Sequence, residues 1–455
     1  SDKEHFPVCL DLHYFMVQCT MSTMESELVG AGALPPHAEE ASLYLHWPFC
    51  LRRCSYCNFN KYVPRRVDNA AMTRCLVKET ATLLRLSRVA RINSVFFGGG
   101  TPSLASPSTI AAVLETVSQN AHLPNEAEVT LEVNPTPTGM AKLKDFTEAG
   151  VNRFSVGVQS LRDDDLKRLG RDHSSWEALK AISEARTLCP GRVSVDVMFG
   201  LPGQSVESWE GELERVLDVC DDHVSLYQLT LERGTQLFKQ VEFGEQTVPG
   251  DDVTAVMYRT ARRILENRGF LQYEVSNFAK NGAVSLHNLG YWRARQYIGV
   301  GPGAHGRFVP QAEGAVQREA RTQTLEPDVW MREVQQVGHG TRRRTRLTQL
   351  ALLEEVLVMA LRMTDGLTHQ DWAMFNPDAG LHCILGQSED VLELQERGLL
   401  ILDVRGLRCS WEGLALLDSM LPTLLFHLEK YISNQEKQKE EGSPSLCQGG
   451  KSKTR

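Results

Sequence analysis

Three cysteines that lie close together in the sequence are the residues best suited to chemistry. Cys50, Cys54 and Cys57 form a C-x3-C-x2-C pattern, which random placement of the same cysteines would produce only roughly 0.006 times in a chain of this length. Three thiolates on one loop can hold a zinc ion or an iron–sulfur cluster. Structural zinc needs a fourth ligand, which His46 would supply. A 4Fe-4S cluster on three thiolates instead leaves one iron open to the amine and carboxylate of a small molecule.

The cysteines follow the first of several predicted strands. From Ser42 onward, short runs of β-branched or aromatic residues alternate with longer helical patterns, which is typical of βα units around a parallel sheet. The predicted strands cover residues 42–46, 94–97, 128–132, 153–158, 193–198 and 224–229. The helices predicted between them cover residues 69–86, 107–120, 139–149, 176–188 and 205–219. Six such units predict a partial or full barrel, and no dinucleotide-binding or P-loop glycine motif follows the first strand.

Polar residues and glycines come at the ends of several of these strands. Gly98-Gly99-Gly100-Thr101 follows the second strand, where missing side chains let the backbone approach a ligand and Thr101 offers a hydroxyl. Glu132 ends the third strand, Gln159 ends the fourth, and Asp196 lies within the fifth. Because barrel active sites gather at the carboxyl ends of strands, these side chains form a candidate site. A capping or supporting role is the alternative for any one of them.

The segment from Tyr44 to Cys57 reads Y-L-H-W-P-F-C-L-R-R-C-S-Y-C and closely resembles the motif of the radical S-adenosylmethionine (radical SAM) superfamily, in the form found in oxygen-independent coproporphyrinogen oxidases. The resemblance covers residues 42–425 and implies an α/β fold, a partial (βα)6 TIM-like radical SAM barrel with a smaller C-terminal helical, winged-helix-like domain. It implies a 4Fe-4S cluster on the three cysteines, an electron donor for that cluster, and S-adenosyl-L-methionine as a second cofactor. No catalytic residue is assigned. The residues that it assigns to S-adenosyl-L-methionine are Tyr44, Tyr56, Gly99, Gly100, Thr101, Glu132, Gln159, Arg171 and Asp196.

Two further features separate functions within this superfamily. True coproporphyrinogen oxidases of this group carry a fourth cysteine in C-x3-C-x2-C-x-C, whereas this chain reads Cys57-Asn58-Phe59. The H-N-x-x-Y-W motif at residues 287–292 resembles that of the HemW-type haem chaperones, most closely their animal mitochondrial branch. This resemblance implies a mitochondrial haem-binding chaperone that delivers haem to respiratory haem proteins and lacks oxidase activity. A radical SAM coproporphyrinogen-III oxidase is the alternative.

The same motif has residues suited to haem. The imidazole of His287 can ligate haem iron, while Tyr291 and Trp292 offer flat apolar surface to a porphyrin. We therefore predict His287 as a haem ligand, with a structural histidine in an aromatic loop as the alternative. His305, in a glycine-rich segment, is a second possible ligand.

Composition limits the partners. The 455 residues include 49 Lys and Arg against 57 Asp and Glu, a net charge of −8, so no nucleic-acid or anionic-membrane surface is predicted. The longest uncharged run, residues 92–114, contains three glycines and four serines, so we predict no transmembrane segment. Residues 1–51 hold one Lys, no Arg and seven acidic residues, the opposite of a mitochondrial presequence. The mitochondrial prediction therefore depends on the resemblance alone.

These observations divide the chain into five segments. We expect a flexible N-terminal segment over residues 1–41, the radical SAM core over 42–230, and a barrel extension with the HNxxYW motif over 231–346. A C-terminal domain of the HemW/HemN type follows over 347–430, where helical patterns precede two short strands across Val404-Arg405-Gly406. Residues 431–455 are polar, and we expect them to be disordered. The basic cluster at residues 342–346 is expected in a solvated loop.

Overall fold

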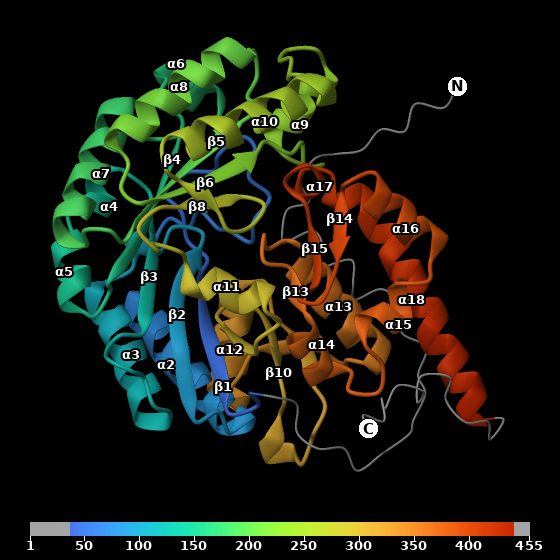
Figure 1. Ribbon diagram of the computed structural model, residues 1–455. Coiled ribbons are helices and arrows are strands. Elements are labelled where there is room, and N and C mark those ends of the chain that lie inside the picture. Colours follow the sequence, from blue (N-terminus) through green and yellow to red (C-terminus); the bar gives the residue numbers. More distant parts are fainter. Residues whose placement is uncertain (1–36, 441–455) are drawn as a thin grey trace. The chain divides into compact units, whose positions relative to one another are not determined.

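The computed structural model describes residues 37–440, which divide into two compact units (Figure 1). The larger unit takes in residues 37–291 and 295–346, and the smaller one takes in residues 347–440 together with 292–294. The three cysteines and all nine candidate S-adenosyl-L-methionine residues lie in the larger unit.

The larger unit is built on one 12-stranded mixed sheet with the order β12-β11-β10-β9-β1-β2-β3-β4-β5-β6-β8-β7. Six strands at its centre run parallel, each paired with the next in sequence. They are β1 (Glu40–Trp47), β2 (Arg91–Gly99), β3 (Glu128–Val133), β4 (Arg153–Gln159), β5 (Val193–Phe199) and β6 (His223–Gln228). The predicted α/β fold of six parallel strands with connecting helices is confirmed, and the predicted strand ends differ from these by no more than three residues.

Side chains alternate between the two faces of these strands. On β4, Phe154 and Val156 are completely buried on the apolar face. Figure 1 shows helices α3, α5 and α7 along one side of the parallel strands. The other face carries Glu128 and Glu132 on β3 and Asp196 on β5. A parallel strand covered on both faces by helices would read as a continuous apolar run. The alternation therefore indicates that the polar face lines the interior of the partial barrel.

The connections between the parallel strands form helices. They are α2 (Asn69–Ser87), η1 (Pro102–Leu104), α3 (Pro107–Asn120), α4 (Pro137–Met140), α5 (Leu143–Glu148), α6 (Asp163–Arg168), α7 (Ser175–Leu188) and α8 (Val206–Val219). Local sequence sets their starts: a capping box of Ser174 and Glu177 opens α7. The single helix predicted over 139–149 is wrong. Lys142 interrupts it with a φ of −114° and donates to the carbonyls of Leu104 and Ala105, both at 3.1 Å.

The sheet continues beyond the parallel strands at both edges. β9 (Tyr297–Val300) pairs parallel with β1, and β10 (His305–Phe308), β11 (Glu319–Gln323) and β12 (Thr341–Arg346) follow it antiparallel. β8 (Asn277–Ala279) and β7 (Leu271–Gln272) extend the other edge from β6. The solvated loop expected at 342–346 is wrong, because these residues pair with β11 as an edge strand. Exposed arginines suit that position, since charge on an edge strand discourages further pairing.

Helices in residues 231–346 were not predicted from the sequence. They are α9 (Gln236–Glu242), α10 (Asp251–Asn267), α11 (Leu286–Trp292), η2 (Gln311–Glu313) and α12 (Pro327–Val337). A buried carboxyl group joins this region to α2, because Glu79 accepts hydrogen bonds from the N–H groups of Gly301 (2.8 Å), Gly340 (2.6 Å) and the Trp330 indole (3.0 Å). The extension is therefore part of the same unit as the strands of the core.

The smaller unit has the predicted winged-helix-like order of helices followed by a two-stranded hairpin. Its elements are α13 (Gln349–Leu361), β13 (Leu367–Thr368), α14 (His369–Phe375), α15 (Leu381–Leu385), α16 (Glu389–Glu396), β14 (Leu400–Leu402), β15 (Gly406–Cys409), α17 (Trp411–Leu414) and α18 (Leu417–Glu440). The hairpin of β14 and β15 turns at the predicted place, and the unpredicted β13 completes an antiparallel sheet.

The ends of the described chain differ in part from expectation. α18 continues to Glu440, so the disorder expected from residue 431 is wrong for residues 431–440. Glu, Lys and Gln favour helix and extend it from its apolar start. Residues 441–455, and residues 1–36 of the expected flexible segment, lie outside the described residues, while Glu40 and Ala41 belong to β1. Within residues 37–440, no helix combines the length and apolar character needed to cross a membrane.

Candidate functional site

The loop between β1 and α2 carries the three cysteines. Its base is closed by two backbone hydrogen bonds, from Tyr62 N–H to the Pro48 carbonyl (2.7 Å) and from Cys50 N–H to the Tyr62 carbonyl (2.9 Å). Its middle is tied to the chain after β4, because Ser55 N–H donates to the Leu169 carbonyl at 2.9 Å. All three cysteines are half-buried free thiols on this anchored loop.

Two neighbouring side chains point donors at the sulfurs. Thr101 Oγ1 lies 3.3 Å from the Sγ of Cys50, and Arg171 Nη1 lies 3.6 Å from the Sγ of Cys54. Burial raises the pKa of Cys50 to about 11; the hydrogen bond from Thr101 offsets part of this, and the charges of Cys57 and Cys54 add to it. The free thiol is therefore protonated at neutral pH, and binding a metal cluster would release that proton.

The geometry does not favour a single metal ion. Across residues 37–440, no three His, Cys, Asp or Glu side chains converge closely enough to hold one. His46, considered as a fourth zinc ligand, has its Nδ1 3.1 Å from the Tyr44 hydroxyl and its Nε2 2.8 Å from the Asn60 carbonyl. Both ring nitrogens are thus engaged by the protein. Three thiols on one loop, with no free nitrogen on His46 to complete a zinc site, fit a cluster held by three thiolates.

The glycines after β2 allow the chain to pack against the cysteine loop. A Cβ on Gly100 would lie 2.9 Å from the backbone of Pro48. Gly99 has a φ of +110°, and its Cβ would lie 2.7 Å from the ring of His46. We predicted these glycines for close approach of a ligand, and the structure shows that Gly100 also allows close approach of the cysteine loop, while Gly99 allows close approach of His46 on β1. Thr101, the next residue, is thereby held beside the loop.

Two half-buried carboxyl groups interact on the polar face of the sheet. Glu132 Oε2 accepts from Gly99 N–H at 3.1 Å, and Asp196 accepts from the hydroxyls of Ser155 (2.6 Å) and Ser194 (2.9 Å). Burial raises the pKa of Glu132 to about 8, the charge of Asp196 adds to this, and the Gly99 N–H opposes it. Burial also raises the pKa of Asp196. Glu132 is therefore mainly protonated at neutral pH, so it can donate as well as accept a hydrogen bond.

Arg171 lies between the cysteine loop and β4. Its Nη2 donates to the Gly157 carbonyl at 3.0 Å and contacts Asn134. Its Nε is buried without a hydrogen-bond partner among the residues that the structure describes. A buried donor without a partner is costly, so this N–H is suited to a bound anion. Tyr56 lies beside the Arg171 charge, and burial raises the pKa of its hydroxyl above the usual value.

Gln159 has a strained backbone. Its φ is +65°, and Ser160 N–H donates across it to the Val158 carbonyl at 2.8 Å, which makes a three-residue γ-turn. A non-glycine residue in this region costs of order 1–3 kcal/mol and persists where its surroundings hold it. Here His173 Nε2 lies 3.1 Å from the same Val158 carbonyl, and Glu212 accepts from the Ser160 hydroxyl at 2.5 Å.

The sequence analysis missed His173 and Glu212. One signal was available for Glu212, because it interrupts the apolar stripe of α8 between Trp209 and Leu213, and all three side chains are buried. A buried carboxylate on an apolar stripe needs hydrogen-bond donors, which indicates a structural or functional contact. No comparable signal marks His173.

Most of the predicted residues lie at or after the carboxyl ends of β1 to β4, whereas Tyr44 and Asp196 lie in the middle of β1 and β5. Hydrogen bonds join the cysteine loop to Thr101 and Arg171, and Gly99 to Glu132. The charge of Asp196 acts on Glu132. Three thiols, a glycine turn beside them and an unpartnered guanidinium N–H fit a metal cluster together with a small charged ligand.

His287 does not join this group. It is 1% exposed, its Nδ1 lies 2.9 Å from the Ser94 hydroxyl, and its Nε2 lies 2.9 Å from the Tyr291 hydroxyl. Its ring stacks on Phe96 with the centroids 4.9 Å apart, and burial lowers its pKa to about 3. Neither nitrogen is open to iron, so the structure does not support the predicted role of His287 as a haem ligand. It favours the structural alternative.

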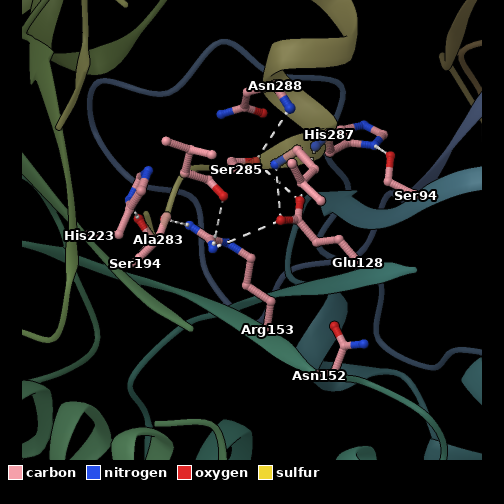
Figure 2. Close-up of polar contacts among 12 residues, drawn as sticks. Ser94, Glu128, Asn152, Arg153, Ser194, His223, Ala283, Ser285, His287 and Asn288 are labelled. Carbon is pink, nitrogen blue, oxygen red and sulfur yellow. Dashed lines mark hydrogen bonds and ion pairs between the residues drawn. The ribbon is translucent and has the colours of Figure 1, made fainter. Parts of the chain in front are cut away.

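Figure 2 shows what the segment around His287 contacts. Glu128, the first residue of β3, accepts from the N–H groups of Leu286 and His287, both at 3.0 Å. Arg153 is the first residue of β4. Its Nη1 lies 3.8 Å from Glu128 Oε2, and its Nη2 donates to the Ala283 carbonyl at 3.2 Å. α11 therefore begins at the amino-terminal end of the sheet, opposite the cysteine loop. Residues at that end of a barrel contribute to stability.

The other residues considered for haem are also packed within the protein. Tyr291 is 9% and Trp292 5% exposed, so neither ring offers an open flat surface in this conformation. His305 is half-buried at the start of β10, with its Nδ1 3.4 Å from the Thr322 hydroxyl.

Two family models match the chain. The model of the radical SAM superfamily matches residues 44–216, and the model of the HemN C-terminal domain matches residues 347–416. The first contains the cysteine loop and all nine candidate S-adenosyl-L-methionine residues, and the second begins at the smaller unit.

Full-length comparisons agree with these models. The chain is 67% identical over 423 residues to the mitochondrial radical S-adenosyl methionine domain-containing protein 1 of Danio rerio, covering 92% of this chain and 95% of the relative. It is 37% identical over 292 residues to the haem chaperone HemW of Escherichia coli, covering 64% of this chain and 74% of that protein. The solved structure of Escherichia coli coproporphyrinogen III oxidase, HemN, matches with a TM-score of 0.71 at 19% identity, over 93% of this chain and 94% of that one. That structural match shows the fold.

Proposed function

This chain belongs to the radical SAM family that unites the mitochondrial radical S-adenosyl methionine domain-containing proteins with the HemW haem chaperones, and from that membership we propose that it is a haem-binding chaperone. In this proposal it carries a 4Fe-4S cluster and S-adenosyl-L-methionine, and it delivers haem to respiratory haem proteins in mitochondria. It has no coproporphyrinogen oxidase activity.

The residue two positions after Cys57 distinguishes a chaperone from an oxidase. The oxidase pattern requires a cysteine there, whereas this chain has Phe59. The kinship with HemW points in the same direction.

The residues of this chain have distinct tasks in the proposal. Cys50, Cys54 and Cys57 hold the cluster, and the unpartnered Nε of Arg171 meets a carboxylate of the ligand. Glu132 and Asp196 accept from ribose hydroxyls. When bound, the reduced cluster supplies the electron that cleaves a carbon–sulfur bond of S-adenosyl-L-methionine.

Replacing Glu132 tests the assignment of this ligand. In Glu132→Gln we expect S-adenosyl-L-methionine to bind about 10-fold or more weakly, because a carboxyl hydrogen bond to the ligand is lost. Equilibrium binding to the reconstituted protein measures this, and iron content should stay unchanged because Glu132 is not a ligand of the metal. Glu126→Gln, on the exposed loop before β3, is the matched control and should bind normally. Unchanged affinity in Glu132→Gln would reject the assignment.

A haem chaperone leaves coproporphyrinogen III unchanged, whereas an oxidase decarboxylates it. The test is to incubate the anaerobically reduced, cluster-loaded protein with coproporphyrinogen III and S-adenosyl-L-methionine. Carbon dioxide and the tetrapyrrole product are then measured. The proposal expects no decarboxylation above a preparation without protein. Sustained turnover would establish the oxidase instead.

A further inference from the structure

Four polar side chains form a block on the interior face of β5 and β6. The strand register places Ser194 opposite His223 and Asp196 opposite Ser225. Because the side chains of a strand alternate between its two faces, all four lie on the same face of the sheet. Ser194, His223 and Ser225 are buried, whereas Asp196 is half-buried. The buried histidine has no task in the ligand assignment, although it lies next to a proposed ligand residue.

A chain of hydrogen bonds leads from Asp196 through this histidine to a tyrosine. Ser194 Oγ lies 2.9 Å from Asp196 Oδ1 and 2.8 Å from His223 Nδ1, and Figure 2 shows Ser194 and His223 side by side. His223 Nε2 lies 2.8 Å from the hydroxyl of Tyr273, the residue after β7. The Tyr273 hydroxyl also accepts from Ser285 N–H at 3.2 Å. The chain thus ends at the residue before α11.

The protons of this chain have one arrangement when Asp196 is ionised. A carboxylate can only accept, so Ser194 gives its single hydroxyl proton to Asp196. The contact between Ser194 and His223 then needs the imidazole proton on Nδ1, which leaves Nε2 as an acceptor. The Tyr273 hydroxyl donates to Nε2. All three donors therefore point toward Asp196.

The charge states of the two ring side chains agree with this arrangement. Burial lowers the pKa of His223 well below its usual value, and the charge of Arg153 adds to this, so the imidazole is neutral. Burial raises the pKa of Tyr273, and the charge of Glu274 adds to this, so the hydroxyl keeps its proton. A neutral imidazole has one donor and one acceptor nitrogen, which matches one acceptor and one donor partner.

The serine hydroxyls fix the orientation of Asp196. Ser194 donates to Oδ1, and Ser155 donates to Oδ2 at 2.6 Å. Burial raises the pKa of Asp196, and hydrogen bonds from Ser155, Ser225 and Ser194 oppose this. Because a carboxylate has about four acceptor positions, three serines leave room for a hydroxyl group of a ligand.

We propose that His223 and Tyr273 are positioning residues for Asp196, and that they act through Ser194 to hold its carboxylate where it accepts from the ribose of S-adenosyl-L-methionine. The inference rests on the proposed binding of this ligand and adds two residues that do not touch it. Neither ring takes part in a covalent or redox step. Their contribution is a fixed donor for Asp196, which also offsets part of the cost of burying its charge.

Tyr273→Phe is the mildest test, because it deletes one hydroxyl and keeps the ring. Without this donor, nothing fixes the proton on Nδ1 of His223, so the imidazole competes with Asp196 for the Ser194 proton. We expect S-adenosyl-L-methionine to bind about 3- to 10-fold more weakly. Equilibrium binding to the cluster-loaded full-length protein measures this. The 2′-deoxy and 3′-deoxy forms of the ligand are measured in parallel.

The deoxy forms separate positioning from a general loss of structure. A ligand without the hydroxyl that meets Asp196 gains nothing from the orientation of Asp196. The deoxy form that the wild-type protein binds most weakly should therefore bind Tyr273→Phe as it binds the wild-type protein. The preference for the complete ribose should shrink by the same 3- to 10-fold that S-adenosyl-L-methionine loses.

Two replacements of His223 give a second, independent readout. His223→Phe removes both nitrogens, and we expect it to weaken binding of S-adenosyl-L-methionine about 10-fold or more. The amide of His223→Asn can place a donor near the position of Nδ1. This variant should bind at least about threefold more tightly than His223→Phe. A residue that only fills space would give the opposite order, because Asn fills less of the site than Phe.

Tyr258→Phe on α10 is the matched control, since it also deletes one hydroxyl that donates to a buried carbonyl, that of Val275 at 2.6 Å. It should keep the wild-type preference for the complete ribose, and all variants should keep the wild-type iron content. The positioning proposal is overturned if Tyr273→Phe keeps the wild-type ribose preference within twofold, or if His223→Asn binds no more tightly than His223→Phe. Wild-type protein that binds no S-adenosyl-L-methionine would overturn the proposed ligand itself, and the inference with it.

Discussion

Cys50→Ala, Cys54→Ala and Cys57→Ala are each expected to reduce the iron and sulfide bound after anaerobic reconstitution from about four of each per chain to near zero. Three thiolates are the smallest set that holds the proposed cluster, and neither His46 nitrogen is available to replace a lost one. Metal analysis and the visible absorbance of the cluster measure the result.

The control for this series is a cysteine far from the loop in sequence. Cys220 is a buried free thiol at the end of α8, and Cys220→Ala should keep its full iron content. Two outcomes contradict the cluster assignment: anoxically prepared wild-type protein that contains zinc alone, or a loop variant that retains four irons.

His287→Ala is expected to lower the free energy of unfolding by about 3 kcal/mol, because it creates a cavity and removes the ring nitrogen to which the buried Tyr291 hydroxyl is hydrogen-bonded. Ser94 and Tyr291 both lose their hydrogen bond to the ring. Denaturant unfolding measures the change. The matched control is His122→Ala at an exposed position before β3, for which we expect less than about 0.5 kcal/mol. An equally small effect in His287→Ala would contradict the packing described here.

The pH dependence of this effect has a defined sign. Burial lowers the pKa of His287 to about 3 in the folded state. Between the unfolded value near 6.5 and that folded value, the unfolded chain binds a proton that the folded chain does not. The stability that His287 contributes is therefore fully present above about pH 6.5 and is lost as the pH falls. The difference between wild type and His287→Ala should be smaller at pH 5.5 than at pH 8 by about 1 kcal/mol.

The parallel strands could be predicted because their sequences alternate in a way that the structure explains. Val193, Val195 and Val197 face the apolar side of β5, while Ser194 and Asp196 face the interior. α10 escaped prediction although Met257, Tyr258, Ala261 and Leu265 have helical spacing, because it lies in a segment with no strand pattern on either side to define a repeating unit.

The candidate site was predictable where residue type and spacing were sufficient. The cysteine pattern and the polar residues at strand ends belong to this class. The left-handed backbone conformation at Gln159 could not be predicted from the sequence, because Gln rarely adopts a positive φ. His173 and Glu212, whose contacts stabilise this turn, are also distant from it in sequence. His287 shows what residue type and spacing cannot reveal: an imidazole beside aromatic residues suits haem chemically, yet tertiary contacts occupy both of its nitrogens in this structure.

The central claim, that this protein binds haem as a chaperone, is tested most directly by titrating haem into the cluster-loaded full-length chain while following the Soret band and the iron–sulfur content. We expect saturable binding of haem with the cluster intact. His287→Ala, under conditions where it is folded, should bind haem with the same Soret position, because neither nitrogen of His287 is open to iron in this structure. Absence of saturable haem binding by the wild-type protein would contradict the proposed function, and a shifted Soret band in His287→Ala would restore that residue as the ligand.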